Sequence, residues 1–456
     1  MSTRPLPENP SLENLRKRAK QLRNERGITL AAAQLAIARE HGFPSWPRMK
    51  AFIEAARPFV WNPPEPQASV EDEFLRHACV DYAGWTLARA AEARRMLAEH
   101  PEIAQANIYT AAATNDVETI ERNATLVNVK GGPNHWEPLL YACYSRIAPT
   151  LDAARALLAL GADPNAGFLW RGNVPPFTAL TGAFGGGEAG ANDPPHPQKL
   201  ELARLLLDAG ADPNDGQTLY NRHFGPNDDH LRILFDYGLG QDKRGPWFHR
   251  LGDRLLSPAQ MLAEELWAAA RKNFVARVKL LVEHGVDVNL PGFRDGRTAY
   301  ESALRAGNDE IAAYLRAHGA KTSQLSDDER FAVACVGGRR DDALALLARD
   351  PSLIQRLGVH GRSELLQRAI ESSHPEGIRL MAELGFDLSA CHRSTPLHEA
   401  AWNGDVALVR LLLDLGADPN VRDPRFDATP LGWAAYNNQK DVVELLTPRT
   451  REAEPT

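Results

Sequence analysis

One short phrase recurs four times in this chain. An apolar stretch runs into a glycine and then into a polar turn in ARALLALGADPN, ARLLLDAGADPN, VKLLVEHGVDVN and VRLLLDLGADPN, which end at Asn165, Asn214, Asn289 and Asn420. Apolar residues at spacings of three and four predict a helix with one apolar face. Glycine supplies the left-handed residue that ends such a helix. Because one unit cannot bury its apolar face alone, the recurrence predicts a stacked array of units.

The best-preserved unit is TPLHEAAWNGDVALVRLLLDLGADPN, which begins at Thr395. Thr395 is predicted to cap a short first helix, and Pro396 fits the first helical position because its missing N–H costs nothing there. Gly404 breaks that helix, and a second helix follows with its apolar face toward the array. Gly416 ends the second helix, and Asp-Pro-Asn makes a turn.

This unit resembles the ankyrin repeat, whose TPLH opening, central glycine and closing GAD(P/V)N are all present. The glycines recur in step: Gly285 and Gly319 are 34 residues apart, Gly385 and Gly416 are 31 apart, and Gly319 and Gly385 are 66 apart, or two units of 33. The resemblance implies an all-α ankyrin-repeat solenoid, built from helix-turn-helix repeats with short hairpin-like loops.

About eleven repeats are predicted over residues 70–448, several of them degenerate, with weak register near 108–136 and 217–258. Their expected starts are Glu71, Ile108, Glu137, Thr178, Gln217, Gln260, Thr298, Glu329, Ser363, Thr395 and Thr429. The last unit carries polar residues from Asn437 to Lys440, as a closing repeat that faces water should. Residues 449–456 are expected to form a tail.

Two stretches exceed the repeat length. Gly161 and Gly210 are 49 residues apart, and the excess falls on the Gly/Pro-rich residues 184–198. A second excess lies at residues 241–258. Such insertions are expected to be mobile surface loops, where binding often occurs. GGGE within the first is no phosphate loop, because it follows no predicted strand and no GK(S/T) occurs.

By its resemblance to the ankyrin family, the chain is expected to bind a partner through its hairpin tips and the exposed residues of the first helices. Aromatic and Arg side chains dominate the energetics of such interfaces. The alternative is that several of these aromatic side chains, Trp170 and Phe177 especially, pack beneath the insertions. The candidates at the matching positions are Trp136, Tyr144, Phe168, Trp170, Phe177, Phe293, Arg305, His392, Trp402, Asn403, Arg425, Phe426, Tyr436 and Asn437.

Residues 1–57 are basic, with 11 Lys/Arg against 5 Asp/Glu in a chain of net charge −7. Three helices are predicted there, and LAIAREHGFPSWPRMKAFI resembles a helix-turn-helix. A closer resemblance is to a segment of bacterial ankyrin-repeat proteins. This module could cap the first repeat, bind DNA, or swing free on the Pro-rich connector 58–69. Candidate DNA-contacting residues are Arg16, Lys17, Lys20, Arg23 and Arg26.

Four cysteines without CxxC spacing favour reduced thiols, and no apolar window is long enough for a membrane span. No metal site is expected, since Cys391, His392 and His398 match no standard zinc spacing. We therefore expect a cytoplasmic, non-catalytic scaffold that binds another protein and needs no cofactor. A DNA-associated regulator is the first alternative, and an enzyme with its site among the insertions is the second.

Overall fold

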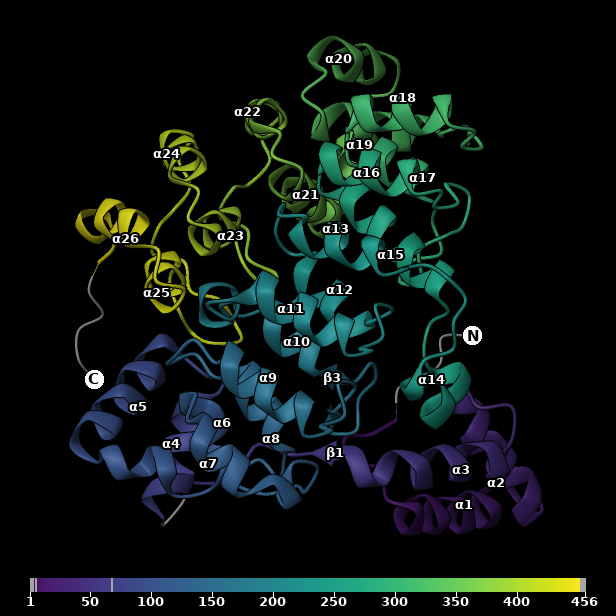
Figure 1. Ribbon diagram of the computed structural model, residues 1–456. Coiled ribbons are helices and arrows are strands. Elements are labelled where there is room, and N and C mark those ends of the chain that lie inside the picture. The colour runs from purple at the N-terminus through teal and green to yellow at the C-terminus, as the bar shows by residue number, and fades with distance from the viewer. Residues whose placement is uncertain (1–3, 5, 67–68, 452–456) are drawn as a thin grey trace. The chain divides into compact units, whose positions relative to one another are not determined.

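The computed structural model describes residue 4, residues 6–66 and residues 69–451, and within these ranges the chain is mostly helical (Figure 1). It divides into two compact units, residues 1–258 and residues 259–456. The all-α architecture predicted from the repeats is confirmed. Residues 67–68 of the predicted connector and residues 452–456 of the predicted tail lie outside the described ranges.

Three helices open the first unit, as their capping residues predict. They are α1 (Leu12–Arg26), α2 (Leu30–Glu40) and α3 (Trp46–Ala56), and the side chains of Ser11, Thr29 and Ser45 accept hydrogen bonds at their N-termini. Their shared core contains Leu15, Ala19, Ile37, Met49 and Ile53. A short 3₁₀ turn, η1 (Arg57–Phe59), follows α3.

Five helix pairs follow in the described part of this unit. They are α4 (Val70–Ala78) with α5 (Leu87–Glu99), α6 (Ile108–Thr114) with α7 (Val117–Arg122), α8 (Pro138–Tyr144) with α9 (Leu151–Ala159), α10 (Ala179–Phe184) with α11 (Lys199–Asp208), and α12 (Gly216–Arg222) with α13 (Asp229–Asp236). Short 3₁₀ turns lie at η2 (Pro101–Gln105), η3 (Ala124–Leu126), η4 (Gly190–Asn192) and η5 (Gly252–Arg254). The first helices of successive pairs pack against each other, α4 on α6, α6 on α8, α8 on α10 and α10 on α12, as stacking requires.

The N-terminal helices are packed against the repeats of their own unit. After η1 the chain forms β1 (Val60–Trp61), which pairs in parallel with β2 (Gly167–Trp170), and β2 pairs antiparallel with β3 (Phe177–Thr178). The second insertion forms α14 (Pro246–Leu251), which lies against α3 (Figure 1). Ala56, Leu169, Trp247 and Leu251 make a common core there. The contacts of these helices in the described residues are thus with β2 and the second insertion.

The first insertion is a folded part of the unit, so the expectation of a mobile loop is corrected. Arg146, which is only 4% exposed, donates from Nε to Pro194 O (2.7 Å) and from Nη2 to Gly182 O (2.7 Å). Its Nη1 also donates to Cys143 O and Ser145 O at 3.0 and 2.9 Å. Carbonyl oxygens from α8, α10 and the insertion thus share one guanidinium, which fixes residues 184–198 against the repeats.

Burial shifts the pKa values of two titratable groups in this insertion in opposite directions. Burial raises the pKa of Asp193 to about 7 and lowers that of His196 to about 3. His196 accepts at Nδ1 from the Gln198 N–H, and Nε2 lies 2.8 Å from the Thr150 hydroxyl. Because that hydroxyl donates to Ala142 O, the ring donates to it and is neutral.

Replacing Asp193 by asparagine is expected to make the insertion acid-sensitive. A raised carboxyl pKa contributes stability that is complete below the unfolded pKa of about 4 and is lost as pH rises through about 7. A lowered histidine pKa contributes stability that is lost as pH falls below about 6.5. As pH falls from 6.5 to 4, the stability contributed by Asp193 rises and the stability contributed by His196 falls, so the two largely offset each other. The Asp193→Asn variant keeps only the contribution of His196. Hydrogen exchange of residues 184–198 at pH 5 and pH 7, corrected for intrinsic rates, would show this. The same change in protection between pH 7 and pH 5 in the variant and in the wild type would contradict it.

The second unit contains six helix pairs in its described part, followed by η6 (Thr447–Arg449). They are α15 (Pro258–Arg271) with α16 (Val275–Glu283), α17 (Ala299–Arg305) with α18 (Asp309–Ala317), α19 (Asp327–Val336) with α20 (Arg340–Arg349), α21 (Leu353–Glu371) with α22 (Pro375–Glu383), α23 (Pro396–Asn403) with α24 (Val406–Asp414), and α25 (Pro430–Tyr436) with α26 (Lys440–Leu446). Gly416 has φ 91°, the left-handed conformation predicted for the end of its helix.

Candidate partner-binding surface

Four aromatic side chains near the C-terminus form one continuous partly exposed surface, which we call the C-terminal aromatic surface: Trp402, Phe426, Trp433 and Tyr436. The Trp402 ring stacks on Tyr436 with centroids 6.0 Å apart and an interplanar angle of 20°. Trp433 meets Trp402 edge-on at 5.9 Å and Phe426 at 6.4 Å. Phe426 is 63% exposed and Tyr436 is 51% exposed, so the fold leaves much of this apolar area in contact with water.

The first helices of two successive repeats place these rings. Trp402 and Tyr436 each stand seven residues after a capping threonine, Thr395 or Thr429, so the same face of α23 and of α25 carries an aromatic ring. These two helices pack directly against each other. The regular spacing of the repeat therefore converts one sequence position into adjacent rings on the surface.

His398 joins the two repeats from within. Its Nδ1 accepts from the Thr395 N–H (3.2 Å), so its Nε2 carries the proton donated to Ala428 O (3.0 Å). Burial lowers the pKa of His398, against the opposing effect of the Ala428 carbonyl. The ring is thus a neutral hydrogen-bonding link to the neighbouring repeat, as the ankyrin resemblance implies for the TPLH histidine.

Asp423 shapes the hairpin tip that carries Phe426. Its carboxylate accepts from the backbone N–H groups of Arg425, Phe426 and Ala428 and from Trp433 Nε1 at 2.8–3.1 Å. Burial alone would raise the pKa of Asp423, but these donors outweigh it and the pKa lies below its usual value. One carboxylate therefore fixes both Phe426 and Trp433.

Replacing Asp423 by alanine is expected to loosen this tip. Four donors would lose their acceptor, and hydrogen bonds to a charged group contribute about 1.5–3 kcal/mol each before relaxation and water repay part of the loss. We expect faster hydrogen exchange over residues 421–433 and little change at α16. Asp414→Ala, at an exposed carboxylate on α24, is the matched control. Unchanged exchange over residues 421–433 would show that Asp423 does not organise the tip.

Trp433 is absent from the residues predicted for this surface, although a sequence signal exists for it. It stands four residues after Thr429, and Tyr436 stands seven after it, so the two lie three apart on one helix face. The equivalent position in the preceding repeat is Glu399, which carries no aromatic ring. A comparison of equivalent positions between repeats therefore misses Trp433, whereas the helical period places it on the same face as Tyr436.

Other predicted residues of the second unit lie in different settings. Asn403 and Arg425 are exposed next to the aromatic surface, and the Arg425 guanidinium lies 4.8 Å from the Phe426 ring centroid. His392 is exposed on the preceding tip. Asn437 is only 3% exposed and donates to Trp402 O at 2.6 Å. The prediction of a partner contact for Asn437 is therefore corrected, because its side chain is used to join two repeats.

Phe293 and Arg305 are not part of the aromatic surface. Phe293 is 74% exposed on a hairpin tip of an earlier repeat, where its backbone N–H donates to Glu264 Oε2. Arg305 is half-buried, and its Nη2 contacts Glu329 Oε1 at 2.6 Å. An arginine held in this way on its neighbouring repeat is less available to a partner.

The remaining predicted aromatics build the core of the first unit. Trp136, Tyr144 and Phe168 are at most 2% exposed, and Trp136 stacks on Phe168 at 4.7 Å. The expectation of exposed contacts is therefore wrong for these three, because Trp61 of β1 packs on Trp136 and Phe168, and Tyr144 packs on the same two rings and donates to Thr178 O. Phe177 is half-buried and stacks on Phe168 at 5.4 Å, and Trp170 is half-buried beneath Arg171.

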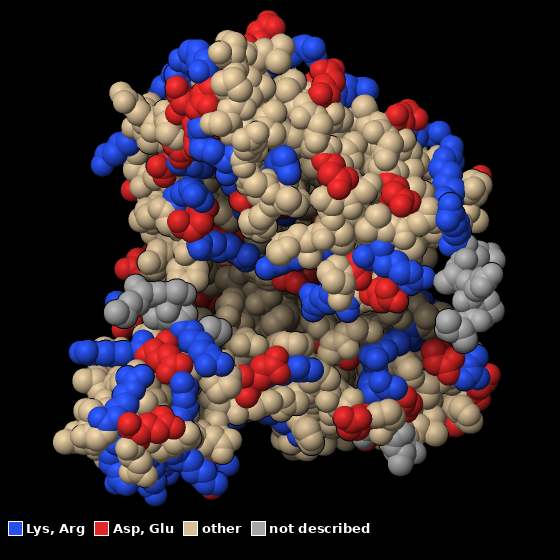
Figure 2. Space-filling view, turned by 180° about the vertical axis from the view of Figure 1, so that it is seen from behind, with Lys and Arg blue, Asp and Glu red and all other residues tan. Residues whose placement is uncertain are grey.

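The basic residues of α1 are exposed, and Lys and Arg gather over the N-terminal helices at the lower left of Figure 2. Lys17 pairs with Glu13, and Arg23 donates to Asn24. Arg16, Lys20 and Arg26 form no ion pair with a residue that the structure describes. This face is solvated and basic, but it carries no aromatic ring.

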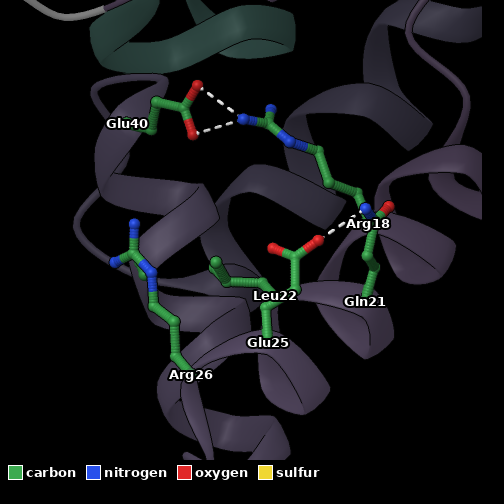
Figure 3. Close-up of a pocket in the computed structure, with 7 residues that line it drawn as sticks. Arg18, Gln21, Leu22, Glu25, Arg26 and Glu40 are labelled. Carbon is green, nitrogen blue, oxygen red and sulfur yellow. Dashed lines mark hydrogen bonds and ion pairs between the residues drawn. The ribbon is translucent and has the colours of Figure 1, made fainter.

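A pocket of about 370 Å³ lies between α1 and α2 (Figure 3). Arg18 reaches across it, and its Nη2 donates to both carboxylate oxygens of Glu40 at 2.8 Å. The bond from Arg18 lowers the pKa of Glu40. Gln21 likewise donates to Glu25 at 2.7 Å. The polar groups of this pocket are therefore mostly satisfied by each other.

Helix α3, which would enter the major groove if this were a helix-turn-helix, is covered on two sides. Met49 and Ile53 face the core of the N-terminal helices, and Phe52 and Ala56 pack toward α14. On the remaining face Lys50 forms an ion pair with Glu54. This packing gives no support to reading of DNA by α3.

Among the described residues no group of three or more His, Cys, Asp or Glu side chains is arranged to hold a metal ion. No helix in the same ranges combines the length and the apolar character that crossing a membrane requires.

Comparison with known families matches the second unit to ankyrin repeats. Models of ankyrin repeats match residues 257–325 and 332–423, and a further ankyrin model matches residues 403–447. An ankyrin repeat-containing protein of Treponema pallidum is 26% identical over 195 residues, which are 41% of this chain and 54% of that protein.

Two further relatives match shorter stretches. The E3 ubiquitin-protein ligase XB3 of rice (Oryza sativa subsp. japonica) is 33% identical over 106 residues, 23% of each chain. The ankyrin repeat protein nuc-2 of Neurospora crassa is 36% identical over 81 residues, 17% of this chain and 8% of that protein. The chain thus spans about half or less of the length of these relatives. The matches, the TPLH capping geometry and the stacked helix pairs together identify the chain as an ankyrin repeat protein.

Proposed function

We propose that this protein binds another protein through the C-terminal aromatic surface. The observation that carries the proposal is the exposure of Phe426 and Tyr436 in continuity with Trp402 and Trp433. Ankyrin repeats are protein-interaction modules, and this surface lies on their first helices and a hairpin tip. Exposed aromatic rings in contact with one another are uncommon unless a partner covers them.

Rigidity of the surface supports the proposal. Trp433 is held by Asp423, and Trp402 and Tyr436 stack on each other, so few rotamers would be lost on binding. Aromatic side chains fixed in this way contribute large buried area at a small cost in conformational entropy. The surface thus has the chemical character of an interface centre.

We propose a non-catalytic role for the chain. At the aromatic surface Asp423 and His398 are both committed to hydrogen bonds within the fold, so neither is poised to move a proton on a bound molecule. The ligase named above carries its activity in a protein of which this chain covers 23%. Four free cysteines support a reducing compartment such as the cytoplasm.

DNA binding by α1 is the weaker alternative. Arg16, Lys20 and Arg26 would supply phosphate contacts, but α3 is packed against α14 and cannot present its whole surface to a groove. A gel shift with the full chain tests this alternative. Salt-sensitive binding that is lost in Lys20→Glu, Arg23→Glu would favour DNA over the proposed protein partner.

Site-specific photo-crosslinking tests the proposed surface. Phe426 is replaced by benzoyl-phenylalanine in the full chain, which is irradiated in its native cells. Leu344, 42% exposed on the outer helix α20, receives the same replacement as a matched control. We expect a crosslinked protein from position 426 that is absent from position 344. The same crosslinked proteins from both positions, or none from position 426, would refute the proposal.

A further inference from the structure

Basic side chains lie on three successive segments of the second unit, which we call the tips. Arg362 lies two residues after the exposed His360, just beyond the kink at Gly358 within α21, Arg393 follows the exposed His392, and Arg425 precedes Phe426. Arg362, Arg393 and Arg425 form no ion pair with any residue in the described ranges. Three arginines whose charge the fold does not neutralise therefore lie on the tips that flank the aromatic rings.

The three tips are joined by direct contacts. The rings of His360 and His392 meet edge-on with centroids 4.8 Å apart. Cys391 Sγ lies 3.8 Å from Arg422 O, and the Asp418 N–H donates to Ser389 Oγ at 2.9 Å. The arginines thus belong to one edge of the second unit and not to scattered loops.

The acidic side chains of this region are already used within the fold. Glu364 pairs with Arg368, and Asp427 pairs with Arg422. Asp423 is buried in its own tip. Glu399 accepts from Ser394 Oγ at 2.6 Å, and burial together with neighbouring Glu371 raises its pKa. The charge that the tips offer to a partner is therefore positive, although the chain as a whole is acidic.

We infer that the partner segment bound at this surface is acidic and carries apolar or aromatic side chains. Its carboxylates would face Arg393 and Arg425, and its apolar side chains would pack on Phe426, Trp433 and Tyr436. This inference rests on the proposed function, since it assigns chemistry to the ligand of the same surface. Charge complementarity of this kind steers association and selects among partners.

A displayed library of random 12-residue peptides, panned on the full chain, tests the inference. We expect the recovered peptides to be net negative and to contain aromatic residues. Their affinity should fall by about tenfold or more in Arg393→Glu, Arg425→Glu, because like charges then face each other. Arg410→Glu, an exposed arginine on the outer helix α24, should leave binding unchanged.

The outcomes separate this inference from the proposed function. Neutral or basic peptides that still require Phe426 and Tyr436 would overturn the inference and leave the proposed surface intact. An equal loss of binding in Arg410→Glu would also overturn it, because the effect would then follow net charge alone. If no recovered peptide depends on Phe426 and Tyr436, the proposed function fails as well.

Discussion

Trp136→Ala is expected to destabilise the first unit by about 3–5 kcal/mol, the range for removing a large buried aromatic side chain. Trp136 contacts Trp61, Tyr141, Tyr144 and Phe168 with ring centroids 4.7–5.6 Å apart. Its removal leaves a cavity between a repeat and the strands that cover it. The cavity persists because the stacked backbones on either side cannot collapse into it.

Trp136→Phe is the matched variant. The indole N–H finds no acceptor among the described residues, so a phenyl ring removes area without breaking a hydrogen bond. We expect this variant to cost less than half as much as Trp136→Ala. Hydrogen exchange of α8 in the full chain reports the opening free energy of this unit without requiring two-state unfolding. Equal exchange of wild type and Trp136→Ala would contradict the packing described here.

Arg146→Met is expected to destabilise the same unit by about 2–4 kcal/mol, although methionine fills much of the volume and removes a buried charge. Four carbonyl oxygens, those of Cys143, Ser145, Gly182 and Pro194, would lose a charged donor. A buried acceptor left without a donor costs about 1–3 kcal/mol, and the relief of desolvation offsets part of the sum.

The effect should concentrate in the insertion, which Arg146 ties to α8 and α10. Limited proteolysis of the full chain is expected to cut Arg146→Met within residues 184–198 under conditions that leave the wild type intact. Arg155→Met, at an exposed arginine on α9, controls for the change of residue type. Resistance of Arg146→Met equal to that of the wild type would show that the guanidinium does not hold the insertion.

The regular parts of this fold follow from local sequence. Thr395, Pro396 and Gly416 act through capping and backbone conformation, which depend on immediate neighbours only. Two of the N-terminal helices are predictable for the same reason, because Thr29 caps α2 and Ser45 caps α3.

Burial of the tip aromatics could not be predicted in this way. Trp136 and Phe426 both precede the first helix of a repeat, yet one is 1% exposed and the other is 63% exposed. The difference arises because Trp61, 75 residues earlier in the chain, lies over Trp136 through the β1–β2 pairing. Nothing near Trp136 in the sequence records that contact. The ordering of residues 184–198 by the distant Arg146 was hidden for the same reason.

The C-terminal aromatic surface was partly visible in the sequence. Trp402, Phe426 and Tyr436 follow from the repeat register, because equivalent positions of adjacent repeats lie side by side. Their contact through Trp433 depends on the exact path of the tip that Asp423 fixes. The sequence VRDPRFDA of this loop does not indicate that the Asp423 carboxylate accepts four hydrogen bonds.

Affinity for the protein crosslinked at position 426 tests the central claim most directly. Binding of the purified partner is measured with three chains: the wild type, the double variant that carries both Phe426→Ala and Tyr436→Ala, and the single variant Leu344→Ala. We predict that the Kd of the double variant rises roughly 10- to 100-fold, as expected for two central aromatic residues, while Leu344→Ala binds like the wild type. A double variant that binds the partner as tightly as the wild type would contradict the claim.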